Sequence, residues 1–306
     1  MSQCPAAGCA LVPLGVHLGD PVPVEALDEL TADEAAAFRA MGYANARVSQ
    51  HSKVAMARRA LPDDSPYVKG ADVVSLAVGS FEDRDEVRGF FRSARLAPKR
   101  IIDLARNTCT TFLTQIDIAA GSIRDGTADA VLCVMAGGVD VEAARIRPDE
   151  HVQSDGACAF ALDGRSPEEP HFRVLGISAS YMHPADVAYP DSEPTKPERD
   201  ALKVASMRTH AQAVLRGAGI GGAEVGHFVV QNLGEARMIN VAKLHGVRPE
   251  TVWLDSLAPN GHVLFADSGV NLFDLFTSGR AADGDYVMVV GSSKVDLGAM
   301  LLQKVG

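Results

Sequence analysis

The feature that most constrains the fold is a set of unbroken apolar segments of strand length. Residues 130–138 are apolar or glycine throughout, and residues 156–162 follow the same pattern. A strand with one face in water alternates polar and apolar residues, so an unbroken run indicates a strand covered on both faces. Residues 72–79 and 285–292 are similar in composition. Sheets covered on both faces require helices on either side of them.

Segments with helical spacing lie between the predicted strands in both halves of the chain. The spacing predicts helices over 23–41, 54–61 and 82–95 in the first half, and over 201–218 and 236–245 in the second. No linker of disordered composition separates the halves, and 306 residues suffice for one large core or two fused cores. The pattern predicts a layered α/β protein with central sheets.

Composition excludes several classes of function. A net charge of -10 without a long basic run argues against nucleic-acid binding. No apolar stretch is long enough to span a membrane, and no signal-peptide pattern begins the chain, so we expect a cytoplasmic protein. The cysteines have no metal-ligand spacing, so no metal site is expected, and Cys4 and Cys9 are expected to stay reduced. Cys133 and Cys158 fall in apolar strands and are interpreted as packing residues.

Cys109 has a more informative setting. A short apolar run at 101–104 precedes it, and apolar residues at helical spacing follow from Phe112. Cys109 is therefore predicted at a strand-to-helix turn, where the free N–H groups and dipole of a helix N-terminus favour a thiolate. A thiolate attacks thioesters and carbonyls. The alternative is a buried, inert cysteine, and the local sequence alone does not decide between the two.

Five motifs occur in one order along most of the chain. They are Asn-Thr-Cys-Thr-Thr-Phe at 107–112, Ser-Asp-Gly-Ala-Cys-Ala at 154–159, Asn-Leu-Gly-Glu-Ala-Arg-Met-Ile at 232–239, Asn-Gly-His-Val at 260–263 and Gly-Asp-Tyr-Val-Met-Val-Val-Gly at 284–291. In these motifs the chain resembles ketosynthase III (3-oxoacyl-carrier-protein synthase III) of the thiolase superfamily. The resemblance implies a thiolase-like α/β fold, in which half-domains at 1–165 and 166–306 form an α-β-α-β-α layered sandwich.

The resemblance also implies an activity and its partners. Cys109 would be the nucleophile that takes an acyl group from a thioester. The donor would be acyl-CoA or an acyl carrier protein, whose acyl-phosphopantetheine is a substrate, so no bound cofactor is expected. A small-molecule acceptor and a homodimer are implied as well.

The chain departs from the condensing members of that family at two positions. Those members hold the malonyl thioester with a histidine and an asparagine, but here Asn232 stands at the histidine position and His262 at the asparagine position. His262 is followed five residues later by Asp267. This pattern is similar to a subgroup of ketosynthase-III-like acyltransferases from antibiotic pathways, which carry a Cys or Ser, a His, and an Asp five residues after the His. The resemblance therefore implies that Cys109, His262 and Asp267 are catalytic.

Acyl transfer to an alcohol or amine needs a nucleophile, a base and a group that orients the base. Cys109, His262 and Asp267 are of these types. On one regular helix, residues five apart would point about 140° away from each other, so His262 and Asp267 meet only if the chain turns between them. The dipeptide Asn260-Gly261 is a turn signal. Without the resemblance, His262 would be interpreted as a surface-loop residue and Asp267 as a helix N-cap.

Four further residues are candidates for substrate binding. Asn232 is either a polar wall of the pocket or a turn residue at a strand end. Ser293 lies in Gly-Ser-Ser-Lys at 291–294, where the family has a glycine-rich loop that supplies an oxyanion donor. The other expected donor is the backbone N–H of the nucleophile. In the family, basic residues near Arg237 and Lys243 meet the carrier protein or the phosphates of coenzyme A; the alternative is a solvated helix face.

Three functions compete. The first is an acyltransferase that serves a hydroxyl or amine acceptor in secondary metabolism. The second is a ketosynthase that forms carbon–carbon bonds in polyketide or fatty-acid synthesis and releases carbon dioxide from a malonyl thioester. The third is a non-catalytic partner subunit of a ketosynthase, which the intact Cys109 disfavours. Residues 182–200, rich in Pro, Asp and Glu, are expected to form a surface loop or lid.

Overall fold

The computed structural model describes residues 8–78, 84–104, 108–139, 145–147, 150–165, 167–180, 195–293 and 296–306. The lid expected at 182–200 lies outside the described residues up to 194, and its last residues belong to a helix instead. Cys4, Asn107 and Lys294 also lie outside the described residues. Across these ranges, no helix combines the length and apolar composition that a bilayer crossing requires.

The described elements alternate between strand and helix, as the sequence predicts. The strands are β1 (Ala10–Leu18), β2 (Asp20–Pro23), β3 (Asn45–Val48), β4 (Val73–Ala77), β5 (Arg100–Asp103), β6 (Ala130–Gly137), β7 (Ile146–Arg147), β8 (His151–Val152), β9 (Gly156–Asp163), β10 (His171–Ser180), β11 (Val225–Val229), β12 (Tyr286–Ser292) and β13 (Leu297–Val305). The helices are α1 (Ala32–Ala40), α2 (Lys53–Arg59), α3 (Pro66–Lys69), α4 (Arg84–Ser93), α5 (Thr111–Arg124), α7 (Lys196–Ala218), α8 (Glu235–Leu244), α9 (Leu257–Asn260) and α10 (Asp267–Thr277).

The main sheet consists of two parts with the same connectivity. Its order is β11-β12-β13-β10-β1-β9-β6-β4-β5. β1 pairs with β9 along its length but with β10 only at Ala10 and Leu11, so a short seam joins the parts. In the first part, the strands in chain order are β1, β4, β5, β6 and β9. When they are numbered 1 to 5 in that order, their order across the sheet is 3-2-4-5-1.

The second part repeats this order when an isolated bridge is included. Val252 forms this single parallel bridge with Phe228 of β11. Counted as the third strand, it gives β10, β11, Val252, β12 and β13 the same 3-2-4-5-1 order. The predicted boundary between 1–165 and 166–306 lies between β9 and β10 and stays a prediction.

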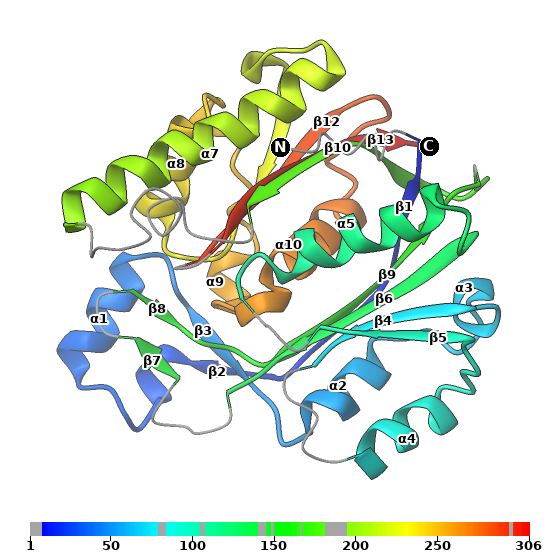
Figure 1. Cartoon of the computed structure of the whole chain (residues 1–306). Coiled ribbons are helices and arrows are strands. Elements are labelled where there is room, and N and C mark those ends of the chain that lie inside the picture. Colours follow the sequence, from blue (N-terminus) through cyan, green and yellow to red (C-terminus); the bar gives the residue numbers. More distant parts are fainter. Residues whose placement is uncertain are drawn as a thin grey trace.

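Helices cover both faces of each part, which explains the unbroken apolar runs. Along β6, Val131, Cys133 and Met135 pack on the same side as the apolar residues of α5, whereas Leu132 and Val134 pack with those of α2 and α4. The residues of β12 and β13 alternate likewise between the central helices and the cluster that includes α7 and α8. Figure 1 shows α5 and α10 between the two parts of the sheet, so the layers are α-β-α-β-α.

The helix predicted over 23–41 is shorter than the pattern suggests. β2 ends at Pro23 and pairs with β3, and α1 begins only at Ala32. Thr31 fixes this start, because its hydroxyl accepts the Glu34 N–H at 3.3 Å and the Glu34 carboxylate accepts the Thr31 N–H at 2.8 Å. Leu27 is buried but lies before the helix. Its position happens to match the helical spacing of the apolar residues in α1, and for this reason the pattern predicted a helix that begins too early.

The two central helices and β9 approach closely at Gly269 of α10. A Cβ atom on Gly269 would lie 2.5 Å from the sulfur of Cys158 and 3.4 Å from ring carbons of Phe112 and Phe160. Phe112 belongs to α5 and both Cys158 and Phe160 to β9, so a side chain at residue 269 would push three elements apart. The absence of a side chain therefore sets the packing distance at the centre of the protein.

Gly269→Ala should lower the free energy of unfolding by about 1–3 kcal/mol, because the added methyl group overpacks this crossing. Gly89 of α4 is the matched control, since no atom of the described residues lies within 4 Å of a Cβ placed there. Gly89→Ala should raise the free energy of unfolding by up to about 1 kcal/mol through helix propensity. Urea unfolding measures both values, and equal changes in the two variants would contradict this view of the core.

Candidate active site

Cys109 lies in the turn that leads into α5. The hydroxyl of Thr111 donates to Thr108 O at 2.7 Å and accepts the Thr108 N–H at 2.8 Å, which tightens the turn. Of the described cysteines, Cys109 is the one whose side chain is not buried. Cys133 and Cys158 are fully buried in the core, and burial raises the pKa of Cys133 to about 12. The accessible thiol is thus the one at a helix N-terminus.

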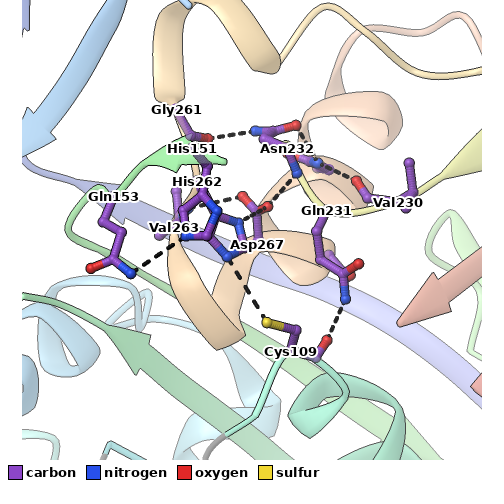
Figure 2. Close-up of polar contacts among 12 residues, drawn as sticks. Cys109, His151, Gln153, Val230, Gln231, Asn232, Gly261, His262, Val263 and Asp267 are labelled. Atoms are coloured by element: carbon purple, nitrogen blue, oxygen red, sulfur yellow. Dashed lines mark hydrogen bonds and ion pairs between the residues drawn. The ribbon is translucent and has the colours of Figure 1, made fainter. Parts of the chain in front are cut away.

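The structure brings His262 against Cys109. Nε2 of His262 lies 3.9 Å from Cys109 Sγ, and Nδ1 lies 2.7 Å from Asp267 Oδ2 (Figure 2). The turn predicted between His262 and Asp267 is present. α9 ends at Asn260, Leu264–Ala266 form a 3-10 turn in which Leu264 has a φ of +50°, and Asp267 is the first residue of α10. Sulfur, imidazole and carboxylate therefore stand in a row, in the order that acyl transfer requires.

Asp267 is fully buried, and its carboxylate accepts three hydrogen bonds. Oδ2 accepts from His262 Nδ1 and, at 2.5 Å, from the Asn232 N–H, while Oδ1 accepts the Val263 N–H at 3.0 Å. The N-cap position of α10 belongs to Ala266, so the carboxylate is not an N-cap. Because this carboxylate only accepts, the network assigns a proton to Nδ1 and directs Nε2 to the sulfur.

The charge of His262 depends on Asp267. Burial alone lowers the pKa of an imidazole, but the Asp267 carboxylate and the contact with Cys109 outweigh burial and raise the pKa of His262 from 6.5 to about 10. His245 is the contrasting case, because burial without a carboxylate partner lowers its pKa to about 4. At neutral pH the His262 ring is therefore an imidazolium flanked by Asp267 and the sulfur.

Asn232 is fully buried and holds the loop that carries His262. Its Nδ2 donates to Gly261 O at 2.7 Å (Figure 2). Its Oδ1 accepts from Asn271 Nδ2 at 2.9 Å. Its backbone N–H donates to Asp267. The observed role of Asn232 is thus to position the histidine and the aspartate. Its direct contact with substrate stays a prediction.

The polar groups of Ser293 are engaged in the turn between β12 and β13. Its N–H donates to Asp296 O at 2.8 Å, and its hydroxyl donates to the Asp296 carboxylate. Gly291 adjoins the nucleophile, because a Cβ there would stand 3.0 Å from Cys109 O. Within the described ranges, no acceptor takes the backbone N–H of Cys109, which leaves this donor for an oxyanion. Substrate contact by Ser293 stays a prediction.

Arg237 and Lys243 are both exposed on α8. The positive charge of Arg237 acts on Tyr43, His151 and Lys203, which places Arg237 beside the site. Lys243 follows about 9 Å further along the helix axis. Their predicted contacts with a carrier protein or coenzyme A stay predictions.

Two residues that the sequence patterns did not identify border the site. The ring of His151 contacts that of His262 edge to face, with centroids 4.5 Å apart. Burial, together with the neighbouring His262, lowers the pKa of His151 to about 3, so this ring is neutral. Gln231 Nε2 donates to Cys109 O at 2.6 Å (Figure 2). Neither residue belongs to a recognisable sequence motif. The one sequence feature that could have pointed to Gln231 is that it precedes Asn232.

Neither a protein-family model nor a curated protein sequence matches the chain. Solved structures match along nearly its whole length. The acyltransferase ChlB3 aligns with a TM-score of 0.80 at 16% identity, covering 97% of this chain and 98% of that one. The 3-oxoacyl-[acyl-carrier-protein] synthase III of Aquifex aeolicus VF5 aligns with 0.76 at 20% identity, covering 97% and 100%. Cerulenin-bound OleA of Xanthomonas campestris aligns with 0.74 at 15% identity, covering 97% of both.

The chain has a thiolase-like fold. This confirms the predicted fold class and accounts for the repeated 3-2-4-5-1 strand order. At identities of 15–20% the likeness establishes the thiolase-like fold, and the activity is argued from the site.

The stability of the protein should depend on pH through His262. Its folded pKa lies above the ordinary 6.5, so its stabilising contribution is complete below pH 6.5 and is lost as pH rises toward 10. The difference in free energy of unfolding between the wild type and His262→Gln should therefore shrink from pH 6.5 to pH 10. Urea unfolding across this range measures it.

His245→Gln is the matched control with the opposite sign. Since the pKa of His245 is lowered to about 4, its stabilising contribution is present above pH 6.5 and is lost as pH falls toward 4. If the difference in free energy of unfolding between the wild type and His262→Gln stays constant with pH, the imidazole carries no additional proton in the folded state.

Proposed function

We propose that the chain is a ketosynthase-III-like acyltransferase. It moves an acyl group from an acyl-CoA or acyl-carrier-protein thioester, through an acyl-Cys109 enzyme, to a hydroxyl or amine acceptor in secondary-metabolite biosynthesis. The observation that carries the proposal is the contact of Cys109 Sγ with an imidazole whose other nitrogen is bound to Asp267. The reaction needs no bound cofactor.

In the loading step, the Cys109 thiolate attacks the thioester carbonyl. A carbon–sulfur bond to Cys109 forms, and the bond to the phosphopantetheine sulfur breaks. The imidazolium of His262, which Asp267 favours, gives its Nε2 proton to the leaving thiolate. The backbone N–H of Cys109 stabilises the oxyanion of the intermediate.

In the transfer step, His262 is neutral and acts as the base. Acylation removes the anionic sulfur, which is one of the groups that raise the pKa of this ring, so the neutral form becomes more accessible. Nε2 takes the proton of the acceptor hydroxyl or amine, whose oxygen or nitrogen attacks the acyl carbon. The bond to Cys109 breaks, and the thiolate and imidazolium of the resting enzyme are restored.

The surroundings of the base favour acyl transfer over condensation. Condensing members of the family which the chain resembles use a histidine and an asparagine as a pair on the malonyl thioester. Here the side chain of Asn232 is hydrogen-bonded to Gly261 and Asn271, so the histidine–asparagine pair of the condensing members is not reproduced. The similarity to the acyltransferase ChlB3 supports the same reaction class.

We also propose the partners of this reaction. Arg237, exposed beside the site, contacts the acidic carrier protein or the phosphates of coenzyme A, with Lys243 further along α8. The second substrate is a small-molecule acceptor, and the active form is a homodimer.

Cys109→Ala should abolish the mass increase that incubation with acyl-CoA or an acyl carrier protein produces, because no nucleophile remains. His262→Ala should still load, more slowly, but should lose transfer by about 10²–10⁴-fold because the base is absent. Asp267→Asn should be milder than either variant, since the imidazole remains. Intact-mass spectrometry follows loading and loss of the acyl group. Transfer at the normal rate by His262→Ala would refute the assignment of the base.

The similarity to 3-oxoacyl-carrier-protein synthase III and OleA makes a carbon–carbon-bond-forming ketosynthase the second candidate. With a malonyl thioester offered to acyl-loaded enzyme, we expect no carbon dioxide above the Cys109→Ala background. Acyl-dependent release of carbon dioxide would instead establish condensation. A wild-type protein that never loads any acyl thioester would support the non-catalytic partner subunit.

A further inference from the structure

The residue before the nucleophile is held from the second half of the chain. Thr108 Oγ1 lies 2.7 Å from Oδ2 of Asp296, whose side chain is buried. Asp296 belongs to the turn between β12 and β13, 188 positions along the chain from Thr108. A carboxylate from the second half of the chain is therefore hydrogen-bonded to the segment that carries Cys109.

The available protons fix the direction of these hydrogen bonds. An ionised carboxylate only accepts, so the Thr108 hydroxyl gives its single proton to Asp296. Thr110 Oγ1, at 2.9 Å from Thr108 Oγ1, must then donate to Thr108. The hydroxyl of Ser293 donates to the other oxygen of Asp296 and accepts the Asp296 N–H at 3.1 Å. The result is a directed chain of hydroxyls that ends on one carboxylate.

Lys203 of α7 is hydrogen-bonded to the same turn. Its Nζ donates to Ser293 O at 3.2 Å. Burial lowers the pKa of Lys203, while the negative groups of Cys109, Asp200 and Asp296 oppose that effect, so the ammonium stands close to the nucleophile and the turn. α7, the β12–β13 turn and the Cys109 segment are thus linked in series.

We propose that this clasp, formed by Thr108, Ser293, Asp296 and Lys203, positions the nucleophile, with Asp296 as its central positioning residue. Gln231 fixes the carbonyl of Cys109 from one side, and the clasp fixes the preceding residue from the other. With both flanks fixed, Sγ moves only by rotation about the side-chain bond. A displacement of about 1 Å at a reacting atom can cost a factor of about 10² in rate.

The test uses a reaction that does not depend on acyl chemistry. Thr108→Val keeps the shape of the side chain and removes the hydroxyl, while Asp296→Ala removes its acceptor. Each should slow alkylation of Cys109 by iodoacetamide, and loading by acyl-CoA, about tenfold. The double variant should be no slower than the slower single variant, because both changes remove the same hydrogen bond between residues 108 and 296. Thr108→Ser restores the donor and should alkylate within about twofold of wild type.

Asp163→Ala is the matched control. Asp163 is a buried carboxylate paired with Arg165 at the end of β9, and it does not belong to the clasp. It should lower stability and leave the alkylation rate within about twofold. If Asp296→Ala fails to fold, the pair Thr108→Val and Thr108→Ser carries the test.

Two results would overturn the clasp: wild-type alkylation of Thr108→Val, or equal losses in Thr108→Val and Thr108→Ser. The clasp rests on the proposed function only for its effect on loading. A wild-type protein that alkylates rapidly but never loads acyl-CoA or an acyl carrier protein would refute the proposed function, while the alkylation series would still decide the clasp.

Discussion

The buried pair of Asp267 and His262 is the interaction on which the site depends. A carboxylate with no exposed surface carries a desolvation penalty of several kcal/mol, which only good hydrogen bonds and a charged partner offset. Asp267 has both, through the N–H groups of Asn232 and Val263 and the ring of His262. The loop from α9 to α10 is shaped by this requirement, because the chain turns at Leu264–Ala266, where Leu264 has a φ of +50°, so that residues five apart in sequence face each other.

The thiolase-like fold places this pair at the meeting point of its two halves. Cys109 stands just before α5 and Asp267 is the first residue of α10, so the nucleophile and the carboxylate both lie at the N-terminal ends of the central helices. The positive ends of the helix dipoles favour negative charge there. His262 lies between them, bound to Asp267 at 2.7 Å and in contact with the sulfur at 3.9 Å. Two helix termini and one imidazolium thus favour negative charge on the carboxylate and on the attacking sulfur, which is the electrostatic basis of the proposed acyl transfer.

Sequence patterns were sufficient for the features that depend on local periodicity. The unbroken runs correspond to β6, β9 and β12, which are covered on both faces, and the turn signal at Asn260-Gly261 marks the bend before His262. The predictions were less accurate where apolar residues outside a helix happened to follow the spacing of the helix. The apolar spacing of 23–41 continued past Thr31, although the capping box there starts the helix. Apart from the pairing of Cys109 with His262, which the family resemblance implied, contacts between distant residues gave no sequence signal. The roles of Gln231 and Asp296, and the hydrogen bond from Asn232 to Gly261, therefore emerged only from the structure.

The protonation state of the His262 ring is the most direct test of this account. Side-chain NMR of protein with 15N-labelled histidine, assigned by comparison with His262→Gln, reports protonation of both ring nitrogens across the pH range. The account predicts that the His262 ring of the unacylated enzyme stays doubly protonated at pH 8, because Asp267 raises its pKa to about 10. A His262 ring that loses its proton near pH 6.5, the ordinary value, would contradict the central role of the Asp267 pair.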